Sequence, residues 1–376
     1  MKHLVMATGV LALTAGAGAA GGIDRSGQGV GNLFEAGRQL ELSFGRVSPS
    51  VSGNDVAAFG GGPSGDVAPG YNQLGLSYKA DINKQLSYAL IIDQPFGANV
   101  IYGAGSVALG GTRAVAEATA LTVLMRYKLD NGFSVHGGVR AQRAKAAIDL
   151  RGAAYGPLGA YSVRMANDTA AGYVVGVAYE KPEIALRVAL TYNSAIEHNF
   201  DTVETGLPGP LAALNGVPSR TKVKTPQTVN LDFQTGVAPG TLVFGQIRWA
   251  DWSSFKLEPV GFDTATGFTG GLIDLEDTFT YTLGVGRRFN ENWAGSFSMQ
   301  YEKKGDPLVS PLAPTNGRIG ATLAAVYTKD NMKITTGINY TKVGNAQPET
   351  GTPDVARANF TGNKSVGIGV RVAFTF

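Results

Sequence analysis

The stretch "SVGIGVRVAFTF", residues 365–376, closes the chain with an apolar side chain at every second position. The apolar positions are Val366, Ile368, Val370, Val372, Phe374 and Phe376. Strict alternation of this kind predicts a β-strand with one apolar face. Because the strand also ends on an aromatic residue, the question is which solvent the apolar row faces.

The same period of two recurs along nearly the whole chain. Segments that alternate in this way are found at 40–44, 74–78, 86–92, 121–127, 133–139, 173–179, 186–192, 229–233, 243–249, 279–285, 293–301, 319–327, 334–340 and 366–376. The sequence therefore predicts an all-β protein of about fourteen strands.

The connections between these segments alternate between short and long. Six are turns of a few residues, and seven are long and rich in Gly, Pro, Asn and Asp, at 48–69, 97–116, 147–170, 197–226, 253–275, 303–317 and 344–362. Short turns at one rim and long loops at the other are typical of outer-membrane barrels. A soluble sandwich would not sort its loops by length in this way. We therefore predict a transmembrane antiparallel β-barrel whose apolar rows face lipid.

Aromatic residues gather beside the short turns, as a girdle at one membrane interface requires. They are Tyr78, Tyr127, Phe133, Tyr179, Phe289, Trp293, Tyr327 and Phe376. Closure into a barrel would also pair every backbone group, which lipid demands.

The first twenty residues have the features of a secretory signal peptide. Lys2 and His3 precede the apolar run "LVMATGVLALTA", and "GAGAA" then offers a cleavage site after Ala19 or Ala20. The alternative is an N-terminal membrane helix, but the run is shorter than the ~20 residues that a span needs. We expect a signal peptide at 1–20 and export to the outer membrane of a Gram-negative bacterium.

Composition excludes several classes of protein. Of 376 residues, 44% are hydrophobic, 16% are charged and 52 are Gly, which is too apolar for disorder and too rich in Gly for a helical bundle. The net charge of +3 is spread along the chain, so we expect no nucleic-acid partner. The absence of Cys excludes disulfides, thiolate metal sites and a catalytic thiol.

We expect neither catalysis nor a cofactor. Neither His136 nor His198 has neighbours at the spacing of a triad or a metal site, and no Gly-x-Ser-x-Gly or Walker sequence occurs. The alternative is an outer-membrane hydrolase whose site is assembled from distant strands.

A barrel of fourteen strands has a lumen that side chains alone do not fill. Strands about 4.8 Å apart and tilted by about 40° give a wall radius of about 14 Å. The lumen must therefore conduct or be plugged. We predict that residues 21–38 form a short N-terminal plug, with Ile23, Arg25, Leu33 and Phe34 inside a barrel of residues 39–376. A periplasmic tail is the alternative.

Five stretches resemble the FadL/TodX family of outer-membrane transporters. They are "IDRSGQGVGNLF" (23–34), "DQPFGA" (93–98), "LTYNSAIEHNF" (190–200), "TPQTVNLDFQTGV" (225–237) and "IRWADWSSF" (247–255). The resemblance covers nearly the whole mature chain. It implies a fourteen-stranded barrel that carries long-chain fatty acids or other hydrophobic compounds inward, past an N-terminal hatch and out through a sideways opening at an inward kink in the third strand.

"DQPFGA" is the predicted place of that kink, at Asp93, Pro95, Phe96 and Gly97. Pro95 cannot donate to the hydrogen-bond ladder, and Gly97 has no side chain to pack. The alternative is that the strand simply ends there. The family's Asn-Pro-Ala stretch before the first strand is missing here, since "LFEAGR" leads directly into "QLELSF".

Ligand-binding residues are predicted on the inward face. Arg140, Arg187, Arg248 and Lys333 are placed to meet a carboxylate headgroup, and Phe244 is an apolar inward residue among Ser, Thr and Gln. The alternative is that these cations pair with acidic side chains of the barrel or plug, namely Asp93, Asp232, Glu302, Asp24 or Glu35.

Two apolar loop stretches, 155–161 and 207–214, are candidates for a first capture surface, although ordinary loop packing explains them equally well. The prediction is a monomeric transporter of hydrophobic small molecules that contacts outer-membrane lipid and lipopolysaccharide. A general diffusion porin and a surface receptor or adhesin are the alternatives.

Overall fold

The computed structural model describes residues 23–267, 271–351 and 353–376. The predicted signal peptide at 1–20 and the first two residues of the predicted plug lie outside these ranges.

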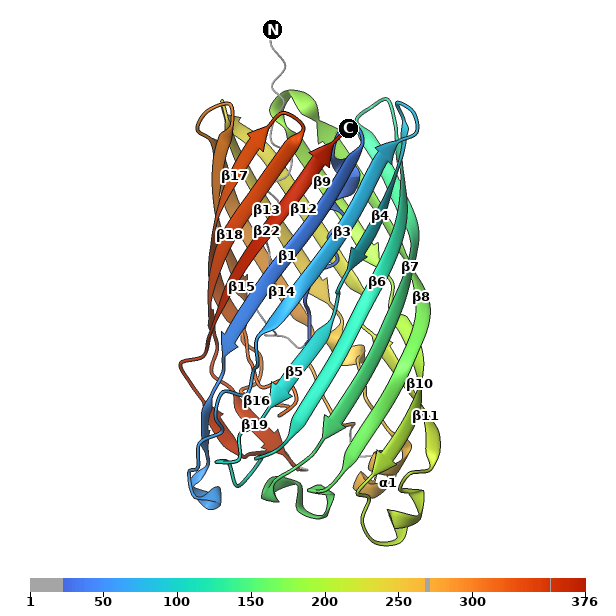
Figure 1. Cartoon of the computed structure of the whole chain (residues 1–376), viewed down its shortest axis with the longest axis vertical. Helices are drawn as coiled ribbons and strands as arrows, with labels where there is room; N and C mark the ends of the chain where they lie inside the picture. Colours follow the sequence, from blue (N-terminus) through green and yellow to red (C-terminus); the bar gives the residue numbers. More distant parts are fainter. Residues whose placement is uncertain (1–22, 268–270, 352) are drawn as a thin grey trace.

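The described residues form a closed antiparallel barrel with fourteen strand positions (Figure 1). The wall consists of β1 (Gln39–Ser50), β3 (Tyr71–Asp81), β4 (Leu86–Asp93) continued by β5 (Gly97–Ile101), β6 (Arg113–Lys128), β7 (Phe133–Asp149), β8 (Ser162–Lys181), β9 (Leu186–Asn193) continued by β10 (Ile196–Thr205), β11 (Pro218–Thr225) continued by β12 (Thr228–Ala238), β13 (Thr241–Ala250), β14 (Thr278–Arg288), β15 (Trp293–Glu302), β17 (Arg318–Lys329), β18 (Met332–Val343) and β22 (Lys364–Thr375). The first and last strands close the barrel, from the pair Gln39–Thr375 to the pair Ser50–Lys364.

Smaller elements fill the rim with the long loops. They are β2 (Gly53–Asp55), η2 (Ala57–Phe59), η3 (Ala153–Leu158), η5 (Gly209–Leu214), η6 (Trp252–Ser254), α1 (Val260–Thr266), β16 (Leu308–Val309), β19 (Gln347–Thr350), β20 (Val355–Ala356) and β21 (Ala358–Phe360). Two further 3₁₀ turns lie elsewhere, η1 (Gly31–Phe34) in the N-terminal segment and η4 (Pro182–Ile184) in a short turn. None of the helices in the described ranges has the length and apolar character needed to cross a membrane.

The alternating rows lie on the outside of the barrel, as predicted. In the closing strand, Ile368 is 54% exposed and the terminal Phe376 is 69% exposed, whereas Ser365, between the outward positions, is fully buried. The same outward exposure recurs at Leu74, Val139 and Leu323 on other strands. Only a hydrocarbon solvent makes such a surface favourable, because exposing it to water would cost about 25 cal/mol per Å².

The strands from β5 to β11 extend further toward the long-loop rim than the alternation predicted. Residues expected in the loops 97–116, 147–170 and 197–226 belong to β5, β10, β11 and the ends of β6, β7 and β8. In these extensions the outward positions carry exposed charges such as Arg143, Lys145 and Lys222. Hydrogen bonding between the strands continues there, but the row of apolar side chains stops where lipid ends. The alternation of apolar residues in the sequence therefore ends before the strand does.

Candidate functional site

The N-terminal segment from Ile23 to Arg38 lies inside the barrel, and we call it the plug segment. Its 3₁₀ turn places Leu33 and Phe34 against inward apolar residues that include Leu124 and Val174. Leu33 is fully buried. A charged residue of the wall also contacts Phe34. The guanidinium carbon of Arg187 lies 4.9 Å from the centre of the Phe34 ring.

The third strand of the wall is interrupted between Asp93 and Gly97, and the plug segment pairs with the interruption. The amide of Arg25 donates to the carbonyl of Pro95 at 2.9 Å, and the amide of Gly97 donates to the carbonyl of Ile23 at 2.8 Å. The plug thus supplies the backbone partners that a neighbouring strand would otherwise provide.

The interruption also leaves one stretch of the neighbouring strand unpaired on one side. Residues 76–81 of β3 pair with β4, whereas residues 71–75 pair with β1 and with no second strand of the described ranges. Side chains occupy this place instead. Gln94 accepts a hydrogen bond from the amide of Leu74 at 3.1 Å. Arg25 lies 3.3 Å above the ring of Tyr71 and donates to the carbonyl of Gly97 at 2.7 Å.

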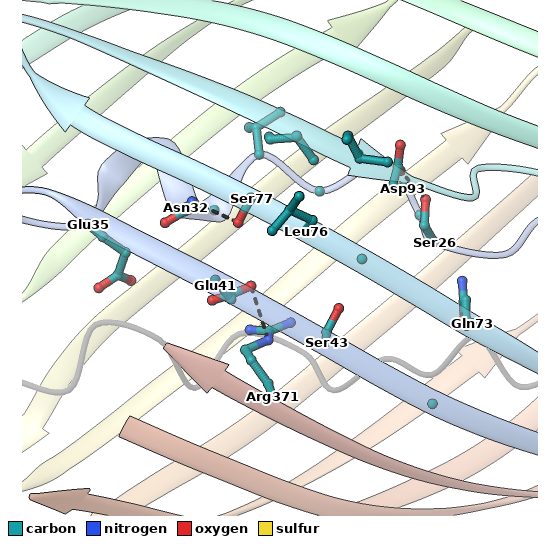
Figure 2. Close-up of a pocket in the computed structure, with 18 of the residues that line it drawn as sticks. Ser26, Asn32, Glu35, Glu41, Ser43, Gln73, Leu76, Ser77, Asp93 and Arg371 are labelled. Carbon is teal, nitrogen blue, oxygen red and sulfur yellow. Dashed lines mark hydrogen bonds and ion pairs between the residues drawn. The ribbon is translucent and has the colours of Figure 1, made fainter. Parts of the chain in front are cut away.

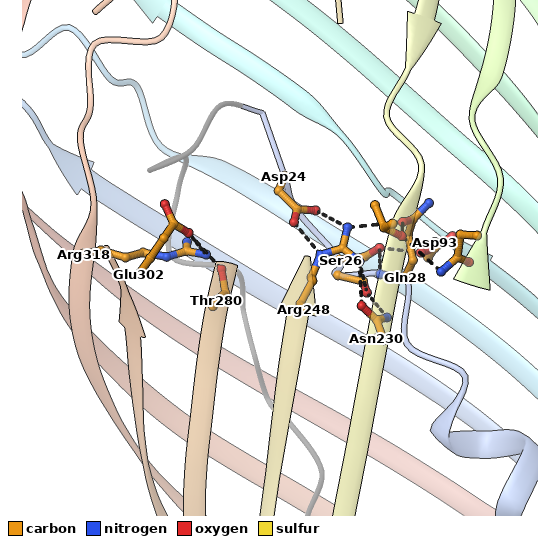
Figure 3. A network of polar contacts seen from close by, with 12 residues as sticks. Asp24, Ser26, Gln28, Asp93, Asn230, Arg248, Thr280, Glu302 and Arg318 are labelled. Carbon is orange, nitrogen blue, oxygen red and sulfur yellow. Dashed lines mark hydrogen bonds and ion pairs between the residues drawn. The ribbon is translucent and has the colours of Figure 1, made fainter. Parts of the chain in front are cut away.

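Arg248 of β13 fixes the plug segment to the opposite wall (Figure 3). Its guanidinium binds both carboxylate oxygens of Asp24, at 2.7 and 3.1 Å, and donates to the carbonyl of Gly27 at 3.0 Å. The side chain of Ser26 hydrogen-bonds the carboxylate of Asp93. Figure 3 shows these groups inside the barrel, with the pair of Glu302 and Arg318 to one side of them, and we call this set of residues the polar layer.

On the long-loop side of this layer lies an almost wholly apolar cavity of about 80 Å³, which we call the outer cavity. Strands, plug and loops all contribute to its lining, with Ile23, Phe96, Ile148, Met165, Phe200, Val223, Phe255, Leu257, Ile273 and Leu312 among them. Lys145 and Glu117 also border this cavity, but their side chains are 49% and 63% exposed on the outward face, where they pair at 3.0 Å.

On the other side of the layer lies a larger and more polar cavity of about 220 Å³, the inner cavity (Figure 2). Glu41 and Arg371, paired at 3.2 Å, and Asp93 lie on its border. Leu74 and Leu76 of β3 also border it, although they are 60% and 37% exposed on the outward face. The inner cavity therefore lies against the part of the wall beside the interrupted strand.

The predicted cations all lie in the lumen, each beside a polar group of the protein. Arg140 donates to Thr122 and Asn193 at 2.8 and 2.9 Å, and Arg187 donates to Gln234 at 3.1 Å. Arg248 holds Asp24 as described above, and Lys333 lies 4.0 Å from Glu35. Among these predicted residues, Arg187 is the one that lines the inner cavity.

Of the other predicted residues, Phe244 is buried over Gly284 and lines neither cavity. In the loop stretch 155–161, Tyr161 is fully buried while Gly156, Pro157 and Ala160 are exposed, and Leu214 at the end of the second stretch is 37% exposed.

Three residues of the site were not predicted from the sequence. Tyr71 and Gln94 occupy the unpaired place in the wall, and Ser26 bonds to Asp93. The signal available for Gln94 was its position directly before Pro95, where a strand interruption leaves a polar side chain free to replace backbone bonds.

Both histidines of the described residues have structural partners. His198 contacts Asp168 at 2.8 Å and Gln142 at 3.1 Å, and His136 contacts Thr191 at 3.0 Å. No group of three or more acidic or His side chains in the described part of the chain is arranged to hold a metal ion.

A plugged barrel with an apolar outer cavity agrees with the sequence comparisons. Residues 46–376 match the family described as "Outer membrane protein transport protein (OMPP1/FadL/TodX)". The chain belongs to this family. It is therefore a transport protein of the Gram-negative outer membrane, as the sequence predicted. No curated protein matches the sequence.

Solved structures of this family share the fold at low sequence identity. A Pseudomonas aeruginosa FadL homologue aligns with a TM-score of 0.71 at 15% identity and 92% coverage of both chains. The Pseudomonas putida toluene transporter TodX aligns at 0.63, 13% identity and 91% of both chains. The Ralstonia pickettii toluene transporter TbuX aligns at 0.63, 12% identity, over 96% of this chain and 97% of its own.

Proposed function

We propose that this protein takes up hydrophobic small molecules passively, with long-chain fatty acids as the first substrate class to test. One observation supports the proposal above the others. The plug segment pairs with an interrupted wall strand, and this pairing separates an apolar outer cavity from an inner cavity bordered by residues of β3 whose side chains face lipid. This arrangement supports a sideways exit at the third strand as part of the proposal.

In this scheme, ligand first meets the apolar side chains of the long loops and enters the outer cavity. It then displaces the pairing between residues 23–26 and 94–97 and leaves through the wall beside Leu74. An apolar exit matters because each methylene kept out of water saves about 0.8 kcal/mol. An axial path would instead pass Glu41 and Arg371 at the periplasmic side.

The size of the outer cavity limits what it holds without rearrangement. Its volume of about 80 Å³ is smaller than the ~150 Å³ of an engineered protein cavity that binds benzene. A few methylenes of an acyl chain fit directly, with the rest of the chain lying between loops. A ring requires side chains such as Met165 to move.

Small uncharged aromatic compounds are the second candidate class. The side chains that face the outer cavity are mostly apolar, and Lys145 and Glu117 pair with each other on the outward face of the wall. A neutral ligand needs no charged partner in such a cavity, whereas burying a carboxylate there is costly.

Reconstitution into liposomes tests the proposal against the porin alternative. We expect the protein to accelerate entry of a long-chain fatty acid or toluene and to leave a small sugar outside. The polar layer and the plug block a water-filled path, so sugar entry at the rate of a porin would contradict the proposal. Binding of a protein partner with no acceleration of either apolar compound would favour the receptor alternative.

A further inference from the structure

Two lysines stand side by side on the outer surface of the barrel, just beyond the lipid-facing rows. Lys342 follows Tyr340 at the next outward position of β18, where Tyr340 is 55% exposed. Lys364 precedes the outward residues Val366 and Ile368 on β22. Both lysines are exposed and lie at the long-loop end of their strands.

The strand register places these two lysines directly opposite each other. The amide of Val343 donates to the carbonyl of Asn363 at 2.9 Å, so the next pair, Lys342 and Lys364, takes the non-hydrogen-bonded position. Side chains approach most closely in pairs of this kind, with Cβ atoms about 4.5–5.5 Å apart. Like charges at this spacing repel each other.

Lys304 brings a third positive charge to the same end of β18. Its side chain reaches over Gly344, two residues beyond Lys342, and its Cε lies 3.1 Å from where a Cβ at Gly344 would be. Glycine at 344 thus leaves the room that the lysine uses. We call Lys304, Lys342 and Lys364 the lysine patch.

No carboxylate of the described residues lies within 4 Å of the ammonium groups of the patch. Exposed cations on β11, on the other side of the barrel, differ in this respect. Arg220 of β11 pairs with Asp201 at 2.9 Å, and Lys222 pairs with Glu197 at 3.6 Å. The charge of the lysine patch is therefore left uncompensated by the chain itself.

We propose that the lysine patch binds the phosphate groups of lipopolysaccharide in the outer leaflet. The patch continues the lipid-facing rows of β18 and β22 toward the long loops, where the headgroups of the leaflet lie. Phosphate carries the opposite charge, and lysine binds it as a compact point charge. One phosphate between Lys342 and Lys364 replaces their repulsion by two attractions. This site is independent of the uptake pathway, since it lies outside the barrel.

Native mass spectrometry of the purified full-length protein tests the site with bisphosphorylated lipid A as the probe. The variant carries Lys342→Gln and Lys364→Gln, and the control carries Arg220→Gln and Lys222→Gln, which are also exposed but ion-paired. Each lysine near an anionic lipid surface contributes about fivefold in affinity, so the double variant should bind about twentyfold more weakly. Lys304→Gln should weaken binding further, and the control should bind like the unmodified protein.

Four outcomes would overturn the proposal: undiminished binding by the double variant, equal binding of dephosphorylated lipid A, equal binding of phosphatidylglycerol, or complete competition by millimolar inorganic phosphate. The double variant should also melt no lower than the unmodified protein, because it removes a repulsion. If it does not fold, Lys364→Gln alone should show about a fivefold loss.

Discussion

The two cavities of the lumen differ in chemistry although the same wall surrounds them. The outer cavity, of about 80 Å³, is lined almost entirely by apolar side chains, whereas the inner cavity, of about 220 Å³, has Glu41, Asp232 and Arg371 on its border. The plug segment divides them. An apolar ligand is therefore favoured in the outer cavity and disfavoured along the barrel axis through the inner cavity.

The wall beside the plug resolves this conflict. At the interrupted third strand the inner cavity extends to Leu74 and Leu76, which face lipid. On the proposed route, a ligand that passes the plug there exchanges one apolar environment for another over a short distance.

Replacing Arg248 with Met should remove the division between the cavities. Breaking a buried ion pair by removing one partner costs about 3–5 kcal/mol, and Arg248 and Asp24 are both largely buried. We expect the plug segment to undock, with open-channel conductance in planar bilayers and rapid trypsin cleavage at Arg25. Arg220→Met, which breaks an exposed pair, is the control. A closed, protease-resistant barrel in Arg248→Met would contradict the role given to this residue.

A carboxylate in the outer cavity should abolish its affinity for apolar ligands. Val223→Asp places a charge among apolar side chains, and we expect binding of a fluorescent fatty acid to fall by about a hundredfold. Val203→Asp is the matched control, because Val203 lies on the neighbouring β10 and is 38% exposed. Equal losses in both variants would place binding elsewhere.

Filling the inner cavity should slow transport but leave capture intact. Ser43 of β1 lines this cavity, and Ser43→Trp should reduce uptake into liposomes by about tenfold while fatty-acid binding to the outer cavity is unchanged. Ser48→Trp, on an exposed position of the same strand, should have no effect. Unimpaired uptake in Ser43→Trp would argue against the sideways route.

The small sheet that β16, β19 and β20 form in the long loops should respond weakly to pH. Burial, together with the negative charge of Asp354, raises the pKa of Glu349 in β19 to about 7. A raised carboxyl pKa stabilises the folded loop at low pH, and this contribution is lost as the pH rises through 7. Amide exchange in β19 and β20, corrected for intrinsic rates, should therefore quicken from pH 5 to pH 8. In Glu349→Gln it should stay constant, and a persistent pH response in that variant would assign the effect to another group.

The barrel could be predicted from the sequence because lipid imposes a period of two on every span. Residues 365–376 show this most clearly, with each outward residue apolar. The strand extensions were missed for the same reason, since Arg143 and Lys145 face outward beyond the lipid and carry no apolar signal.

The cavities depend on contacts that no local pattern reveals. Arg248 meets Asp24 across 224 positions of sequence, and Phe96 meets Trp252 with ring centres 5.5 Å apart. The inward position of Arg248 in its strand allowed two roles, either ligand binding or pairing with an acidic residue. Only the folded plug brings Asp24 to it. The outer cavity likewise joins Ile23 to Leu312, which lie far apart in the sequence.

Amide hydrogen exchange at Arg25, Ser26 and Gly97, followed with and without a long-chain fatty acid during uptake, shows whether ligand displaces the plug from the interrupted strand. These amides make the hydrogen bonds that join the plug to the interrupted strand. If ligand passes by displacing that pairing, their exchange should accelerate when ligand is present, while amides of β14 and β17 stay protected. Full protection of all three amides during sustained uptake would contradict the account.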